Sequence, residues 1–183
     1  MLRRRRAAII NKQSVPYGME KVEYLQTGEA GPYLKTDVIV NDYGDNFGFR
    51  TNFLYTDADG AWVTNILILG ARKSSMVENI ELSRYGGGML RWGTEEKHYD
   101  FSINKLITAE FKNLEFNYKI DGVEKQRFSY TAGQTLAKVP FYLFALNQNE
   151  SVRYRAKNTR IYDVIFYNAD KKISHYIPTI NKN

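Results

Sequence analysis

From Val22 onward, apolar and polar residues alternate with a period of two or form short apolar runs, and turn residues separate these segments. Both patterns are typical of β-strands. Apolar runs such as ILILG predict strands covered on both faces, whereas alternating runs such as LEFNYKI predict strands with one exposed face. The expected strands are Val22–Leu25, Tyr33–Val40, Asn46–Tyr55, Asn65–Ala71, Ile80–Arg84, Met89–Gly93, Lys97–Phe101, Leu106–Lys112, Glu115–Ile120, Val123–Tyr130, Phe141–Asn147, Ala156–Tyr167 and Lys172–Pro178.

Two turns are predicted by residue type. Asp121-Gly122 separates FNYKI from VEKQRF, and both residues tolerate the positive φ angles that a two-residue type I′ hairpin requires. The sequence YGGG at Tyr85–Gly88 predicts a second hairpin tip. Many short strands at intervals of about 8–12 residues, with little helical pattern, predict an all-β fold in which two antiparallel sheets form a sandwich.

The first 20 residues differ from this pattern. Four consecutive arginines, Arg3–Arg6, precede a segment that becomes polar after Ile10. A signal peptide would continue with about 7–15 apolar residues, so we expect this segment to be retained. The sequence therefore predicts an extended basic arm over residues 1–20 and one domain over residues 21–183.

Composition narrows the class of protein further. A chain of 183 residues is long enough for one domain with its own core, and the absence of cysteine excludes disulfides and thiolate chemistry. No apolar run approaches the ~20 residues of a membrane-spanning helix. The four arginines supply most of the net charge of +6, which leaves +2 for the rest of the chain. A body with so little charge is a poor surface for nucleic acid, so long-range attraction would come from the arm.

Three segments carry a family resemblance. VEYLQTGEAGPYLKTD at residues 22–37 resembles the opening of a concanavalin A-like (laminin-G-like) jelly-roll family that occurs in phage structural proteins and gut bacterial surface proteins, although extra residues separate Gly28 from Tyr33. FYLFALN at Phe141–Asn147 resembles a late strand of that family, and the segment from Arg160 to the end resembles its closing hairpin. The resemblance implies a two-sheet jelly roll. Its members include sugar binders, adhesion modules and virion parts, so it does not decide the function.

The sequence offers little for catalysis. Some glucanases with this fold carry acidic residues at alternating positions of one strand, which places two carboxylates on one face. The acidic pairs of this chain have spacings of three or one, which direct the partners to opposite faces of a strand. His98 and His175 are too few for a histidine metal site. We therefore expect no enzymatic activity; the acidic pairs considered are Glu20/Glu23, Glu78/Glu81 and Glu95/Glu96.

Calcium and sugar are the two ligands considered for the domain. Asp57 and Asp59 begin a segment that resembles a calcium loop but lacks the downstream glutamate, so we expect no bound metal and no cofactor. Trp62, Trp92 and Tyr99 flank loops, and exposed aromatic rings there would stack on sugar rings. The alternative for each of the three is a place in the core.

The arm suggests binding to a partner. Arginine pairs bidentately with carboxylate or phosphate groups, and the arm contains no aromatic residues between its arginines, which favours contact with protein over packaged DNA. The sequence thus predicts a structural protein of a tailed-phage virion, a capsid auxiliary or decoration protein made in the bacterial cytoplasm. The arm would bind the major capsid protein or a neighbouring subunit. The alternative is a lectin-like adhesion module of a bacterial or phage surface. The residues predicted to bind the partner are Arg3, Arg4, Arg5, Arg6 and Lys12.

Overall fold

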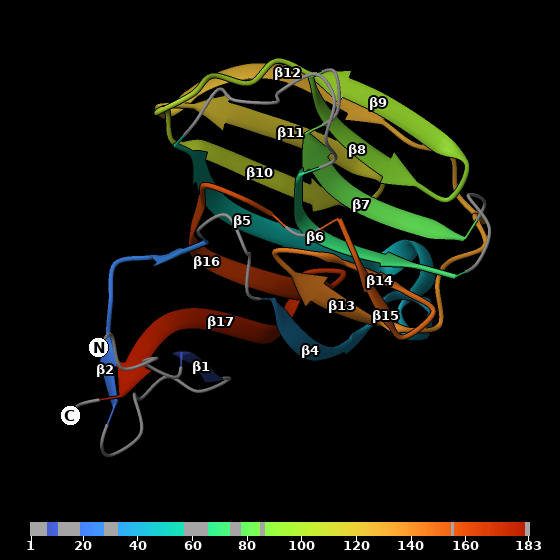
Figure 1. Cartoon of the computed structure of the whole chain (residues 1–183). Coiled ribbons are helices and arrows are strands. Elements are labelled where there is room, and N and C mark those ends of the chain that lie inside the picture. Colours follow the sequence, from blue (N-terminus) through green and yellow to red (C-terminus); the bar gives the residue numbers. More distant parts are fainter. Residues whose placement is uncertain are drawn as a thin grey trace.

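The computed structural model describes residues 7–10, 19–27, 33–56, 66–73, 78–84, 87–154 and 156–181. These residues form two stacked β-sheets, which Figure 1 shows as two layers. The nine-stranded sheet consists of β1 (Ala7–Ile10), β2 (Met19–Lys21), β3 (Leu25–Gln26), β5 (Phe47–Tyr55), β10 (Ile107–Lys112), β11 (Glu115–Ile120), β12 (Val123–Ser129), β16 (Thr159–Asn168) and β17 (Lys171–Asn181).

The second layer is an eight-stranded sheet, and its strand order is non-sequential, as expected of a jelly roll. Its neighbouring strands pair antiparallel except for β14, which runs parallel to β6. Two short 3₁₀ turns, Val40–Asp42 and Gly44–Asn46, connect the two sheets. The strands of this sheet are β4 (Leu34–Ile39), β6 (Ile66–Arg72), β7 (Asn79–Arg84), β8 (Gly88–Trp92), β9 (Glu95–Tyr99), β13 (Pro140–Leu143), β14 (Leu146–Gln148) and β15 (Ser151–Arg153).

Aromatic side chains from both sheets fill the space between the layers. The ring of Phe47 on β5 stacks on Phe141 of β13 with centroids 5.4 Å apart, and it also packs against Trp92 of β8 at 6.4 Å. Phe111 of β10 reaches Trp92 from the opposite layer at 4.7 Å. Large rings bury much apolar surface for each residue ordered, so this cluster stabilises the sandwich without disulfides.

The predicted strands agree well with the observed ones, and the hairpin at Asp121-Gly122 is confirmed, with φ angles of 49° and 81°. One difference concerns FYLFALN, which was expected to form a single strand. Phe144 has a φ of 63°, so the chain turns there and the segment divides into β13 and β14. β13 pairs with β4 and β6, whereas β14 pairs with β6 and β15.

The described part of the N-terminal arm pairs with the end of its own chain. Ala7–Ile10 lies antiparallel to Ile177–Ile180 of β17, and β2 pairs with the opposite edge of the same segment, where Thr179 faces both Ala8 and Lys21. In Figure 1, β1, β2 and this part of β17 project beyond the sandwich. The predicted boundary between arm and domain after residue 20 falls within β2, so residues 7–10 and 19–21 add strands to the nine-stranded sheet.

Candidate functional site

Most residues that the sequence nominated for binding lie outside the described part of the chain. This applies to the arginine run and Lys12, and to the loop residues Asp57, Asp59 and Trp62. Their predicted roles remain predictions. The two remaining nominees, Trp92 and Tyr99, are described.

The expectation that Trp92 and Tyr99 are exposed is wrong, because the side chains are 0% and 3% exposed. Trp92 lies two residues after Leu90 on β8, so both side chains point into the core. Tyr99 packs against Tyr118 at 5.0 Å, and its hydroxyl donates a hydrogen bond to the carbonyl of Ser83 at 3.5 Å. Neither ring can stack on a sugar, and both stabilise the sandwich.

The structure instead assembles a polar surface on the outer side of the eight-stranded sheet. Glu81 lies between the core-facing Ile80 and Leu82, and Arg91 lies between the core-facing Leu90 and Trp92, so both point away from the core. Residues in register on neighbouring strands share a face. One such row crosses the sheet through Lys35, Tyr142, Gly70, Glu81, Arg91 and Glu96.

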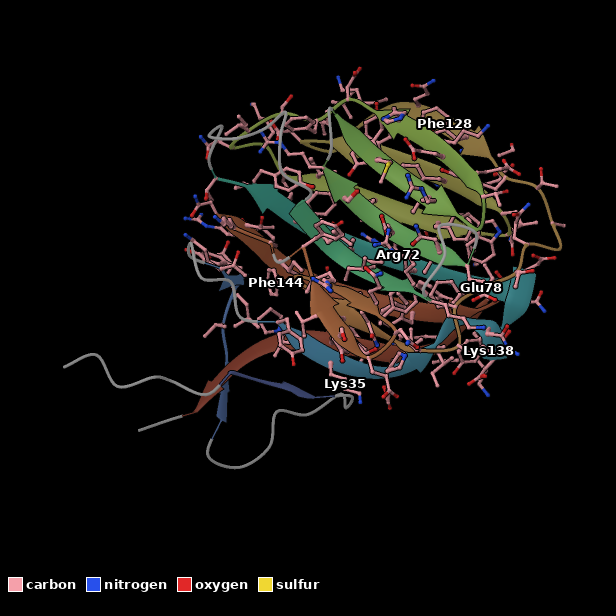
Figure 2. The ribbon with its side chains drawn as sticks, turned by 45° about the vertical axis from the view of Figure 1, so that its right-hand side comes forward. Lys35, Arg72, Glu78, Phe128, Lys138 and Phe144 are labelled. Carbon is pink, nitrogen blue, oxygen red and sulfur yellow. The ribbon has the colours of Figure 1, made fainter. Side chains whose placement is uncertain are left out.

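We call this surface the polar face and define it by its charged residues. Figure 2 places Arg72 over the middle of this sheet, with Lys35 at its lower border. The charged residues of the polar face are Lys35, Arg72, Glu81, Arg91, Glu96 and His98.

A chain of ion pairs runs across the polar face. Glu81 receives two arginines, with Arg72 Nη1 at 3.5 Å from its Oε1 and Arg91 Nη1 at 3.7 Å from its Oε2. Arg91 also binds Glu96, whose other oxygen lies 2.8 Å from Nε2 of His98. Glu81 is 2% exposed, so this charge is buried and depends on its two arginines for compensation.

The two carboxylates of this chain have opposite pKa shifts. Burial raises the pKa of Glu81, although the positive charges of Arg72 and Arg91 partly oppose that effect. Burial also acts against ionisation of Glu96, but the hydrogen bond and charge of Arg91, together with His98, lower its pKa overall. Glu96 is the more exposed of the two, which explains why its partners outweigh desolvation there.

Two exposed tyrosines lie at the polar face. The described residues include four exposed large apolar side chains, and only Tyr33 and Tyr154 among them are aromatic, at 37% and 47% exposure. Tyr33 stacks on Tyr142 with ring centroids 4.9 Å apart. The guanidinium carbon of Arg72 lies 5.8 Å from the Tyr154 ring centre, and Arg72 Nη2 donates to Gln148 Oε1 at 2.7 Å. Aromatic rings and hydrogen-bonding groups are thus adjacent.

Sequence reasoning missed these residues. Arg72 ends the apolar run of β6, and a charge at that position was a local sign that the run does not face the core throughout. Tyr154 carried no such sign, because its exposure depends on where β15 is placed.

The described residues contain no group of three or more metal-ligating side chains. Within the same residues, no helix is long and apolar enough to cross a membrane. Asp45, which belongs to an acid-rich segment near the start of β5, accepts a hydrogen bond from the backbone N–H of Gly133 at 2.9 Å. This contact ties two loops together.

Solved structures of low sequence identity share the fold. The CBM40 of the Ruminococcus gnavus IT-sialidase matches with a TM-score of 0.58 at 13% identity, over 85% of this chain and 94% of that one. The botulinum neurotoxin serotype D binding domain matches with a TM-score of 0.55 at 10% identity, over 90% of this chain and 44% of that one. Domains LG4-5 of the mouse laminin alpha1 chain match with a TM-score of 0.50 at 14% identity, over 91% and 47%.

No protein-family model and no curated protein sequence matches this chain. It spans less than half of the neurotoxin and laminin chains and nearly all of the CBM40 chain. These likenesses establish the fold as a concanavalin A-like, laminin-G-like jelly roll, which confirms the fold that the sequence resemblance implied.

Proposed function

We propose that this protein is a non-enzymatic carbohydrate-binding module and that the polar face is its binding surface. The observation that carries the proposal is the position of the exposed Tyr154 ring beside Arg72 and Gln148. A sugar presents C–H groups on the faces of its ring and hydroxyls around its edge. An aromatic face with adjacent donors and acceptors complements both features.

The fold supports this proposal by analogy. One solved structure with the same fold is named as a CBM40, a carbohydrate-binding module, of a sialidase, and another as the binding domain of a neurotoxin. Because one fold hosts many functions, the analogy raises the expectation of binding and the polar face supplies the surface.

The arrangement of carboxylates argues against glycoside hydrolysis. Hydrolysis requires two carboxyl groups that flank the scissile bond, one as the acid and one as the nucleophile or base. Glu81 and Glu96 have pKa values shifted in opposite directions, but Glu81 is 2% exposed and lies beneath its arginines. A group so buried does not reach a glycosidic bond.

Retention on a glycan array tests the proposal. Replacing Tyr154 by alanine should lower retention about tenfold, the equivalent of about 1.4 kcal/mol, because the exposed ring is lost. The melting temperature should stay unchanged, since Tyr154 contributes little to the core. Val123→Ala is the matched control, because Val123 is exposed on the other sheet. An intact protein that retains no glycan would overturn the proposal.

The narrower prediction of a head-associated phage protein remains a prediction. It rests on the arginine run, which lies outside the described residues, and on the family resemblance. Glycan binding and a place in a virion are compatible, because a particle can carry a binding module on its surface.

A further inference from the structure

We infer that the polar face takes a neutral glycan in preference to one that carries a carboxylate. This inference rests on the proposed function and adds the chemical class of the ligand. It is argued from the way the two arginines of the polar face are already occupied by the protein's own side chains.

Tight recognition of an acidic sugar depends on a guanidinium with N–H groups directed at the ligand. In this structure Arg72 directs Nη1 to Glu81 and Nη2 to Gln148. Arg91 directs Nη1 to the same glutamate and Nη2 to Glu96. The two forks that could hold a ligand carboxylate therefore bind groups of the protein.

The charges at the centre of the face also balance. Arg72 and Arg91 supply two positive charges, and Glu81 and Glu96 supply two negative ones. A ligand carboxylate that displaced Glu81 would leave a charge at 2% exposure without a partner, and breaking a buried pair in this way is strongly unfavourable. A neutral sugar avoids this cost and uses the hydroxyl-binding capacity of the same side chains.

The charges at the border of the face are too exposed to reverse this preference. Lys35 and Arg153 are exposed cations, and the exposed Glu150 is close enough to Tyr142 to raise the pKa of that hydroxyl, after the larger effect of burial. Ion pairs at exposed positions contribute about 0–1 kcal/mol. The border therefore has charges of both signs and selects weakly between neutral and acidic ligands.

An array of matched oligosaccharides tests the inference. Each neutral oligosaccharide is printed beside a version that differs only by a terminal sialic acid or uronic acid. We expect retention on the neutral member to exceed that on its acidic partner about tenfold or more. Equal or stronger retention on the acidic members would overturn the inference and leave the proposed function standing. Retention on no member would overturn both.

Removing one internal carboxylate should change the preference. Glu96→Gln frees one side of Arg91 and suits the test because the Glu96 side chain is 32% exposed, so the variant should fold. We expect retention on acidic glycans to rise about fivefold and to weaken with added salt. Glu115→Gln, an exposed change on β11 of the other sheet, should leave both readouts unchanged.

Glu81→Gln is the stronger variant, since it removes the partner of both arginines. Its folding is checked by circular dichroism before the array is read. If Glu96→Gln is folded and its retention on acidic glycans does not rise, the inference is wrong, whatever the result with Glu81→Gln.

Discussion

Gly88 begins β8 directly beneath the ring of Tyr99, its register partner on β9. A Cβ at position 88 would lie 2.2 Å from Cε2 and 2.4 Å from Cδ2 and Cζ of that ring. The ring has no room to move, because it packs against Phe116 at 5.5 Å and Tyr118 at 5.0 Å. Glycine is therefore required here by close approach to a buried aromatic side chain.

Replacing Gly88 by alanine should lower the free energy of unfolding by about 2 kcal/mol, the usual cost of overpacking a core. Urea denaturation measures this value. In a Tyr99→Ala background the ring is absent, so the same change at position 88 should cost little. An equal cost in both backgrounds would show that the contact with the ring is not the cause.

At the scale of elements, β17 and β4 join the two sheets at one edge of the sandwich. The hydroxyl of Tyr176 on β17 donates a hydrogen bond to Oδ1 of Asp37 on β4. Burial and the adjacent carboxylate of Asp37 raise the pKa of Tyr176 to about 12, against an ordinary value of 10.0. The two sheets are thus linked by a group whose protonation state matters at alkaline pH.

This link predicts a pH dependence of stability. The folded pKa of Tyr176 is raised, so its contribution is fully present below about pH 10 and is lost as pH rises towards about pH 12. Tyr176→Phe should lower the melting temperature at neutral pH by removing one hydrogen bond, worth about 1 kcal/mol. The difference from the unmodified protein should shrink between these pH values. A difference that stays constant with pH would contradict the assignment.

At the scale of the whole molecule, the sandwich and the N-terminal strands are separable. Every residue of the described core cluster lies between Val38 and Tyr176, whereas β1 and β2 pair with the part of β17 beyond that point. The pairing contributes backbone hydrogen bonds outside the main core. The sandwich therefore has its own source of stability.

Deletion of residues 1–20 should leave a folded sandwich whose melting temperature changes by about 4 °C or less. If the phage role is right, this variant should fail to enter the virion because it lacks the arginine run. Thermal melting followed by circular dichroism checks the first part, and the copy number of the variant in purified particles checks the second. Normal incorporation would refute the anchoring role of the arm.

The sequence by itself determined the strands and their turns. Period-two alternation in RIYDVIFY, and the tolerance of Asp121 and Gly122 for positive φ, are local properties that do not depend on distant residues. The same local signals predicted a two-layer sandwich, because segments with one apolar face must bury it against a second sheet. The spacing of Glu95 and Glu96 likewise placed them on opposite faces, as observed, with Glu95 binding the backbone of Thr131.

Only the tertiary structure decided which residues meet. Arg72, Glu81 and Arg91 come from three strands, and their contacts follow from a register that no single strand reveals. The burial of Trp92 depends on Phe47 and Phe111, which reach it from the opposite sheet. A local pattern says that a strand has two faces, but which groups cover each face is decided by the strands packed around it.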